Sequence, residues 1–472
     1  MKNKIWSAIV AGIMTCAVTA GLAFSTGCAT KVPEFEMPEG GYDGSAVEIT
    51  FANTTGQNLE GVVNTALERF KVLYPNITVN VDNTTKSWDD FASNIATRLT
   101  SQKQPNVAFC YSDHVATYNQ ANAVLALDDF LPGGAFEKMT VTNTAGTEPL
   151  GLTQAQVDDY VEAFFAEGSI YEDGKTYTLP FAKSTEVLFY NKTFFTKHNL
   201  TVPTTWEEME EVCAQIIEKT NDEKTIALGY DSEANLFITL CEQYGSPYTS
   251  ATGDHFLFDN AKNREFVEML KRWYDSRYLT TKETYGEYSS NLFKQQLCYM
   301  SIGSTGGSSY QDPGITDGSA AFEVGVASIP QVNPDNPKTI LQGPSVCIFK
   351  KANPQEVLAS WLLVKFLTTD IAFQGQYSEI SGYTPVTKSA FNSPAYQEFL
   401  GEADSATGLT ARTAIIGRNM AESNAFYTSP AFIGSSTARE QVGLLVKTYL
   451  QGTVTLEQAF ATAIEECKYF AG

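Results

Sequence analysis

The chain has 472 residues, of which 43% are hydrophobic, so it can bury a sizeable core and is long enough for two or three domain-sized units. Its 34 glycines and 18 prolines are ordinary numbers, which excludes fibrous and low-complexity proteins. With 32 basic and 54 acidic residues the formal net charge is −22. A negative charge of this size repels nucleic-acid phosphates, so we expect no nucleic-acid partner.

The beginning of the chain has the pattern of a targeting segment. Lys2 and Lys4 give a positive start, an apolar stretch covers residues 5–24, and small residues then lead to Cys28. This resembles the cleavage box of bacterial lipoproteins, although Ser25 stands where that box usually has leucine. The alternative is an uncleaved helical anchor, because the stretch is just long enough to span a bilayer. Both interpretations put the folded body outside the cytoplasm, and we favour lipidation of Cys28 by a fatty acyl group such as palmitate.

The next part predicts a flexible tether and a first α/β block. Residues 29–45 carry prolines, glycines and acidic residues with little to bury, which is typical of a tether. The elements then expected are a strand at 47–52, a helix at 59–74, a strand at 77–81, a helix at 88–101 and a strand at 106–111. Strands and helices that alternate over short connections predict a parallel sheet. Ligands of such sheets bind beyond the carboxyl ends of the strands, where Trp88 and Asp113 fall.

A second α/β block follows in the middle of the chain. Its expected strands are 175–180, 186–190, 225–230 and 298–302, and its expected helices are 206–219, 236–244 and 263–278. A glycine- and serine-rich turn at 303–309 leads to strands at 323–329 and 342–349. From residue 354 onward the chain is mostly helical, with an irregular stretch at 381–387. The sequence pattern therefore predicts two units, both of the α/β class.

Motifs of catalysis and metal binding are absent from the sequence. The three histidines are isolated and form no H-E-x-x-H site, and there is no G-x-S-x-G elbow. The six cysteines after Cys28 are widely spaced without a C-x-x-C pair, which favours buried thiols over disulfides or zinc ligands. A glycosidase's pair of carboxylates stays open, because their separation is a three-dimensional quantity. We expect no metal, no cofactor and no enzyme activity.

An ordered set of motifs resembles the extracellular solute-binding proteins (family 1) of ABC importers, in their lipoprotein form, and among them the maltose-binding and glycerol-3-phosphate-binding types. Residues 179–192, with the sequence Leu-Pro-Phe-Ala-Lys-Ser-Thr-Glu-Val-Leu-Phe-Tyr-Asn-Lys, resemble the family's strand that crosses between lobes. Residues 203–209 match its Pro-x-Thr-Trp helix start, and 300–304 and 382–387 follow in the family's order. The set runs through most of residues 45–470.

The resemblance implies a two-lobed α/β fold of the periplasmic-binding-protein type II, with three interlobe crossings near 181–186, 300–304 and 343–346. The expected division is a signal segment at 1–28, the tether at 29–45, an N-terminal lobe of 46–183 plus 303–344, and a C-terminal lobe of 184–302 plus 345–472. Closure of the lobes about a hinge would trap a ligand and present it to permease subunits in the membrane. We expect a monomer held by its lipid on the outer face of the membrane or in the periplasm.

The residues expected to contact the ligand combine aromatic faces, hydroxyls, carboxylates and glycine turns, as a polyhydroxylated ligand requires. They are Trp88, Asp113, Ser184, Thr185, Tyr230, Asp231, Ser304, Thr305, Gly343 and Tyr383. Trp88 and Tyr383 lead this set because the resemblance places them at cleft-facing positions. For each residue the competing interpretation is an ordinary core, turn or capping role.

The expected function is capture of a sugar or oligosaccharide for import. In the glycerol-3-phosphate branch an arginine holds the phosphate, and the matching stretch 429–434 has none, while Arg412, Arg418 and Arg439 are nearby but out of register. A polyol-phosphate ligand such as glycerol-3-phosphate is therefore the second possibility within the family. Outside it, a secreted carbohydrate-active enzyme and a surface receptor that keeps the fold without transport stay open as rival functions.

Overall fold

The computed structural model describes residues 34–85, 88–316, 319–405 and 407–471. The signal segment with Cys28, and the tether up to residue 33, lie outside the described residues. Among the helices of the described ranges, none is long and apolar enough to cross a membrane.

The first lobe is built on a mixed sheet with the strand order β2-β1-β3-β15-β6. Its strands are β1 (Val47–Ala52), β2 (Ile77–Asp82), β3 (Val107–Cys110), β6 (Leu179–Pro180) and β15 (Ser345–Ile348). As predicted, β1 pairs in parallel with β2 and β3. The added strand β15 runs antiparallel to both β3 and β6, so the sheet is mixed.

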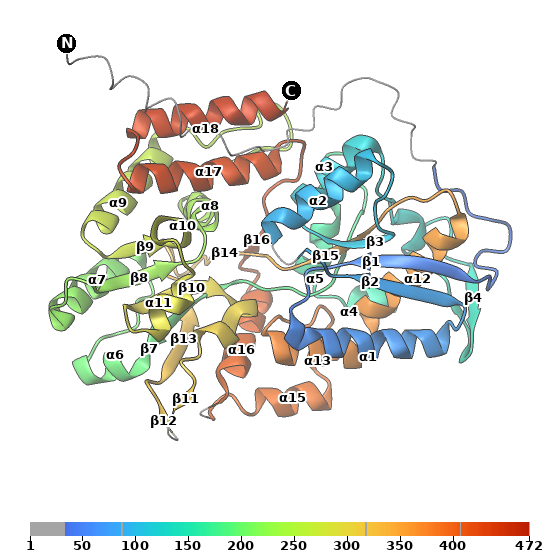
Figure 1. Cartoon of the computed structure of the whole chain (residues 1–472), viewed down its shortest axis with the longest axis horizontal. Helices are drawn as coiled ribbons and strands as arrows, with labels where there is room; N and C mark the ends of the chain where they lie inside the picture. The colour runs from blue at the N-terminus through green and yellow to red at the C-terminus, as the bar shows by residue number, and fades with distance from the viewer. Residues whose placement is uncertain (1–33, 86–87, 317–318, 406, 472) are drawn as a thin grey trace, which may run out of the picture. The chain divides into compact units, whose positions relative to one another are not determined.

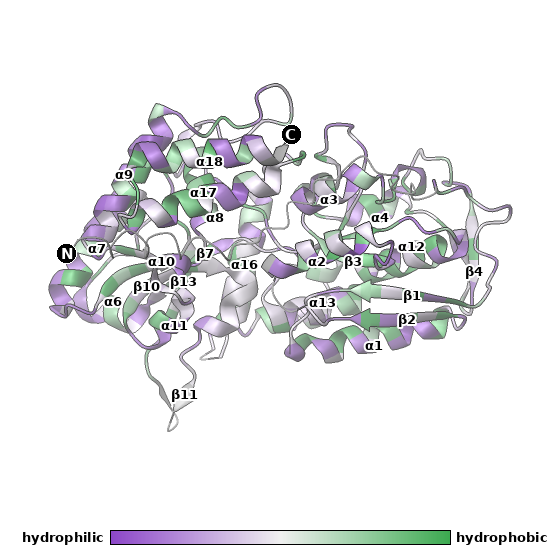
Figure 2. Cartoon of the chain, turned by 45° about the horizontal axis from the view of Figure 1, so that its top comes forward, coloured by the Kyte–Doolittle hydropathy of each residue, from purple (hydrophilic) through white to green (hydrophobic). Residues whose placement is uncertain are grey.

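Helices of the first lobe come from two separate stretches of the chain. They are α1 (Gln57–Leu73), α2 (Trp88–Thr100), α3 (Ser112–Tyr118), α4 (Gln154–Asp159), α5 (Glu162–Ala166), α12 (Pro354–Thr369), α13 (Ile371–Ser381), α14 (Lys388–Phe391) and α15 (Pro394–Leu400), with a hairpin of β4 (Thr140–Asn143) and β5 (Gly146–Pro149). Helix α12 packs against β1, and α1 lies beside α13 (Figure 1). Figure 2 shows hydrophilic and hydrophobic residues alternating along α1, the pattern of a helix with one buried face.

The second lobe is built on a sheet with the strand order β13-β7-β10-β8-β9. These strands are β7 (Glu186–Asn191), β8 (Ile226–Tyr230), β9 (Leu279–Thr281), β10 (Cys298–Ser304) and β13 (Val324–Ser328). The accompanying helices are α6 (Lys192–His198), α7 (Trp206–Thr220), α8 (Glu233–Tyr244), α9 (Ala261–Asp275), α10 (Lys282–Tyr285), α11 (Ser289–Lys294), α16 (Leu409–Glu422), α17 (Ser435–Leu450) and α18 (Leu456–Ala471). Two short strand pairs complete it, β11 (Ile315–Thr316) with β12 (Ser319–Ala320) and β14 (Thr339–Ile340) with β16 (Phe426–Tyr427).

Local sequence explains where helix α7 begins and ends. The Thr205 hydroxyl accepts from the backbone N–H of Glu208 at 3.2 Å, and the Glu208 carboxylate accepts from the backbone N–H of Thr205 at 3.3 Å. This reciprocal capping box satisfies two backbone donors that the helix itself leaves unpaired. The helix ends at Asn221, which adopts the left-handed conformation that asparagine tolerates better than most residues.

Each sheet has a hydrophobic core of its own, and the cysteines lie inside these cores. Cys110 and Cys347 are buried in the first core, and Cys213, Cys241 and Cys467 in the second. Cys298 is buried in a smaller cluster beside the second sheet. All six are free thiols, so buried apolar packing is the role that the structure gives them.

The chain passes from one core to the other three times within the described residues, between Ala182 and Val187, between Ile340 and Leu341, and between Val386 and Leu409. The first lies within the crossing expected at 181–186, and the second lies two residues before the one expected near 343–346. The one expected near 300–304 is misplaced, because β10 stays in the second sheet between β7 and β8.

The late elements differ from the expected division of the lobes. Helices α12 and α13, expected in the C-terminal lobe, pack on the first core, and Thr339–Ile340, expected in the N-terminal lobe, pairs with β16. Two longer strands also join the other sheet. Val324–Ser328, expected in the N-terminal lobe, pairs with β7 of the second sheet, whereas Ser345–Ile348, expected in the C-terminal lobe, pairs with β3 of the first sheet. The local pattern of a short apolar stretch predicts a strand but not the sheet that it joins, because pairing partners are set by tertiary packing.

The described part of the expected tether, residues 34–45, lies along the first lobe. Phe35, Met37 and Tyr42 pack against the first core. The Glu34 carboxylate also pairs with the Lys350 ammonium at 2.8 Å. Side-chain packing, this ion pair and hydrogen bonds to Gln355 hold a stretch whose prolines and glycines predicted a flexible tether.

Gly343, at the second crossing, gives a test of how tightly the crossings pack. Its φ is +97°, and a Cβ atom would lie 2.4 Å from the carbonyl oxygen of Ala182. Backbone strain and the clash together predict that Gly343→Ala lowers the free energy of unfolding by about 2–4 kcal/mol in urea titration. The control is Gly174→Ala, at φ +66° with no atom within 4 Å of the new Cβ, for which we expect a loss of about 1 kcal/mol. Equal losses in the two variants would contradict close packing at the crossing.

Candidate functional site

The segments that cross between the lobes are hydrogen-bonded to one another. The Ser184 N–H donates to the Gln342 carbonyl at 2.8 Å and the Gln342 N–H donates back at 3.0 Å. The Thr384 N–H donates to the Lys183 carbonyl at 2.7 Å. Beside it, the Tyr383 ring lies over Gly306, where a Cβ atom would come within 2.8 Å of the ring. Six of the residues expected from sequence come together here, namely Ser184, Thr185, Ser304, Thr305, Gly343 and Tyr383.

Several side chains at these crossings are already bonded within the protein. The buried Thr185 hydroxyl lies 2.7 Å from the Thr339 hydroxyl and donates to the Ile340 carbonyl at 2.8 Å. The Thr305 hydroxyl accepts from the Thr185 N–H at 3.3 Å. The Ser304 hydroxyl accepts from the backbone N–H of Gly306 at 3.1 Å. These bonds hold the crossings in place, which is a positioning role beside the expected ligand contact.

A buried lysine ties the first crossing to the second. Lys183 is fully buried, and its ammonium donates to the Glu167 carboxylate, to the Gly343 carbonyl at 3.1 Å and to the Ser345 hydroxyl at 2.8 Å. A charge buried to this degree requires an opposite charge and further hydrogen bonds around it. The arrangement satisfies both requirements.

Next to the crossings lies a polar cluster that we call the Glu186 cluster, made of Glu186, Tyr230, Asn235, Gln342 and Arg439. The Glu186 carboxylate accepts from the Tyr230 hydroxyl and from the Asn235 side-chain amide, the latter at 2.6 Å. The same amide donates to the Gln342 side-chain oxygen at 3.2 Å. The Arg439 guanidinium donates to the Asn235 side-chain oxygen. The cluster therefore joins β7, β8, α8, the second crossing and α17.

Burial and hydrogen bonding shift the pKa of Glu186 in opposite directions. Its burial raises the pKa of Glu186 to about 7, while hydrogen bonds from Tyr230 and Asn235 and the charge of Arg439 lower it. The same residue thus combines an acceptor for hydroxyl groups with a protonation change near neutral pH.

The first lobe presents aromatic rings and a carboxylate near this cluster. The half-buried Trp88 stacks on Phe109 with ring centroids 6.0 Å apart, and its centroid lies 5.0 Å from that of Tyr111. Burial raises the pKa of Tyr111, the charge of Tyr383 raises it further, and that of Arg439 lowers it, so the Tyr111 hydroxyl lies within electrostatic reach of both. Asp113 lies in the first turn of α3, and this helix contacts α17 of the second lobe.

Four of the expected side chains, those of Ser184, Thr185, Tyr230 and Thr305, are buried, and the carboxylate of a fifth residue, Asp231, is already bonded within the protein. Tyr230 is fully buried and its hydroxyl is used by Glu186. The Asp231 carboxylate accepts from the backbone N–H of Ser289 at 2.8 Å and from its hydroxyl at 2.6 Å. Burial also raises the pKa of Asp231, which these bonds lower. Tyr230 and Asp231 therefore have a supporting role in the site, because their polar groups are already bonded within the protein.

Four site residues, Glu186, Asn235, Gln342 and Arg439, were not predicted as ligand contacts. In the sequence Arg439 is out of register with the arginine that holds phosphate in the glycerol-3-phosphate branch. Only the tertiary structure shows that its guanidinium reaches Asn235. None of the four stands in a local sequence pattern that marks a binding site.

Metal ligands do not gather anywhere in the part of the chain that the structure describes, because no three side chains of histidine, cysteine, aspartate or glutamate lie close enough to hold an ion.

A protein-family model matches most of the chain. Residues 65–400 fit the model of the bacterial extracellular solute-binding proteins, more than two thirds of the sequence. The chain belongs to this family. The family is extracellular, which supports the expected position of this solute-binding protein outside the cytoplasm.

A curated relative is the maltotriose-binding protein of Pyrococcus abyssi (strain GE5 / Orsay), which is 25% identical over 243 residues. This match spans 50% of the present solute-binding protein and 50% of that relative.

Solved structures confirm the two-lobed fold along nearly the whole chain. UgpB from Mycobacterium tuberculosis in complex with glycerophosphocholine gives a TM-score of 0.72 at 17% identity, over 90% of this chain and 98% of that one. The GacH receptor of Streptomyces glaucescens, solved unliganded and with acarbose, gives 0.68 at 18% identity over 90% and 98%. The maltose/maltodextrin-binding domain MalE from Bdellovibrio bacteriovorus, bound to maltotriose, gives 0.66 at 18% identity over 90% and 98%.

The raised pKa of Glu186 makes stability of the solute-binding protein depend on pH in a defined direction. Because the pKa of about 7 in the folded state lies above the ordinary 4.5, the folded state holds more protons between these values. The contribution of Glu186 to the free energy of unfolding is therefore full below about pH 4.5. It falls by about 3 kcal/mol as pH rises through about 7. We expect Glu186→Gln to remove this part of the pH dependence, measured by urea unfolding from pH 4.5 to 8.

The matched control is Glu218→Gln on α7, where the glutamate is exposed. It should leave the pH dependence of unfolding as it is in the wild type. A Glu186→Gln variant that keeps the full wild-type slope would contradict the assignment.

Proposed function

We propose that this solute-binding protein captures a sugar or oligosaccharide between its lobes and delivers it to an ABC permease. The observation that carries the proposal is the Glu186 cluster of donors and acceptors on the second lobe, together with the contact of its helix α17 with α3, which follows Tyr111 on the first lobe. Asn235 and Arg439 supply donors from the second lobe, and Trp88 and Tyr111 supply aromatic rings from the first. Sugars need this combination, because their hydroxyls bind polar groups and their C–H faces pack on aromatic rings.

Closure about a hinge follows from where these groups lie. The two sides of the site are on different lobes, joined by crossings that are hydrogen-bonded to one another. A ligand that contacts both sides stabilises the closed arrangement over the open one by the difference in contacts. Names of similar proteins point to the same ligand class, since they include a maltotriose-binding protein and structures with acarbose and maltotriose.

A phosphate ester is the second candidate ligand, and Arg439 is the observation that favours it. A guanidinium at the site binds phosphate well, and the similar UgpB structure contains glycerophosphocholine. Glu186, however, shares Asn235 with this arginine, and a carboxylate in that position opposes a second anion. We therefore rank the neutral sugar first.

Binding and closure can be measured together with maltotriose as the probe. We expect maltotriose to raise the melting temperature and to lower the radius of gyration in X-ray scattering, and Trp88→Ala to weaken its affinity at least about tenfold through loss of the aromatic face. Tyr285→Ala, at an exposed tyrosine on α10, is the control and should bind as the wild type does. Absence of binding by maltose, maltotriose and glucose alike, or binding without compaction, would sink this proposal, and tight binding of glycerophosphocholine instead would favour the phosphate ester.

The lipid anchor at Cys28 is the part of the proposal that the sequence alone supports. We expect the mature protein extracted from membranes to begin at Cys28 and to carry fatty acyl chains, which intact-mass spectrometry detects as an added hydrocarbon mass. Cys28→Ser should abolish this mass and release the protein from the membrane fraction. An unmodified chain that keeps residues 1–27 would show the helical anchor instead.

A further inference from the structure

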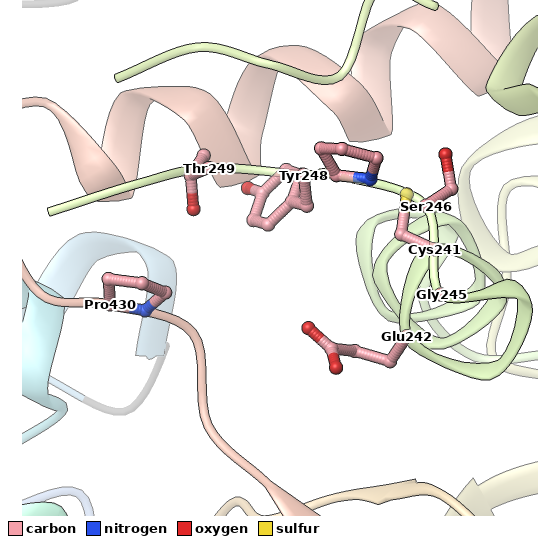
Figure 3. Close-up of a pocket in the computed structure, with 8 residues that line it drawn as sticks. Cys241, Glu242, Gly245, Ser246, Tyr248, Thr249 and Pro430 are labelled. Atoms are coloured by element: carbon pink, nitrogen blue, oxygen red, sulfur yellow. The ribbon is translucent and has the colours of Figure 1, made fainter. Parts of the chain in front are cut away.

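A cavity of about 310 Å³ lies in the second lobe, away from the residues expected from sequence. It is formed by the end of α8, the segment after this helix and Pro430, which lies between β16 and α17 (Figure 3). The volume is at the lower end of the range of about 300–1,000 Å³ that small-molecule sites occupy.

The lining carries polar groups that lack partners. The hydroxyls of Tyr248 and Thr249 are buried and have no hydrogen-bond partner among the described residues, and Tyr248 as a whole is only 6% exposed. Buried hydroxyls are nearly always paired, because an unpaired one loses its bonds to water without replacement. A ligand in the cavity that carries hydroxyl groups would supply the hydrogen bonds that these two side chains lack.

Glu242 adds a carboxylate to the same lining. Figure 3 shows its carboxylate and the Thr249 hydroxyl directed toward the space that also borders Pro430. Burial raises the pKa of Glu242, and the charge of Lys338 lowers it. A partly desolvated carboxylate favours hydroxyl donors and disfavours anionic groups such as phosphate.

The cavity shares helix α8 with the Glu186 cluster, although no residue of the cluster lines it. Burial raises the pKa of Tyr248, the charge of Arg439 lowers it and that of Asp113 raises it, so the Tyr248 hydroxyl lies within electrostatic reach of residues on both sides of the site. Helix α8 also carries Asn235 of the cluster near its start and Glu242 near its end. Seven residues of helix separate the two along the axis by about 10 Å, which is longer than one six-membered sugar ring.

We propose that this cavity is a second sugar subsite, which binds a terminal pyranose ring of an oligosaccharide whose other rings lie at the Glu186 cluster. The proposal rests on the proposed function and narrows its ligand to a neutral oligosaccharide. Ring hydroxyls donate to the Glu242 carboxylate and pair with the hydroxyls of Tyr248 and Thr249. Pro247 and Pro430 offer C–H surface to the ring.

The test compares glucose and maltotriose by isothermal titration calorimetry, because only the longer sugar reaches both places. We expect wild type to bind maltotriose more tightly than glucose, and Glu242→Gln and Thr249→Val each to reduce the ratio of the two affinities about tenfold by removing a hydrogen-bonding group. Thr252→Val, at an exposed threonine three residues further along, is the matched control and should leave the ratio unchanged. Urea midpoints equal to wild type show that the variants fold.

The outcomes separate this subsite from the function on which it rests. Maltotriose binding with an unchanged affinity ratio in both variants, or equal affinity for glucose and maltotriose in the wild type, overturns the subsite and leaves sugar capture standing. Binding of neither sugar overturns both. A crystal structure with maltotriose should place a ring within hydrogen-bond distance of Glu242, and a ring elsewhere overturns the subsite.

Discussion

The buried ammonium of Lys183 is the interaction on which the junction of the lobes depends. It sits in the first crossing, and its partners are the Glu167 carboxylate and groups of Gly343 and Ser345 in the second. A charge without access to water is tolerated only when every partner is in place, so the pair fixes the two crossings against each other. Backbone bonds of Ser184 with Gln342 follow from that alignment.

The polar chemistry of the candidate site is a consequence of the same alignment. Glu186 follows Lys183 by three residues, so fixing the crossing also fixes this carboxylate between Tyr230 and Asn235. Asn235 in turn orients the Arg439 guanidinium. A network in which each member has a partner is rigid, and a rigid set of donors and acceptors binds a ligand with little cost of reordering.

Proteins that share this fold bind different ligands, so the backbone alone does not decide ligand chemistry. Similar structures contain ligands as different as glycerophosphocholine and acarbose, although their backbones match this chain over nine tenths of its length. In this protein the nearby carboxylates of Glu186 and Glu242 balance the single guanidinium of Arg439. Helix α8 connects the two carboxylate environments, since it carries Asn235 at one end and Glu242 at the other. That balance is the reason why we propose a neutral, hydroxyl-rich ligand.

The sequence by itself determined the kind and the order of the elements. Alternating strands such as Val47–Ala52 and helices with a capping box such as α7 are local patterns, and motif order was enough to identify the family. The tertiary structure decided which sheet each late strand joins, as with β13 and β15, because pairing depends on partners far along the chain. It also decided the site: Arg439 meets Asn235 across 204 positions of sequence, a contact that no local pattern encodes.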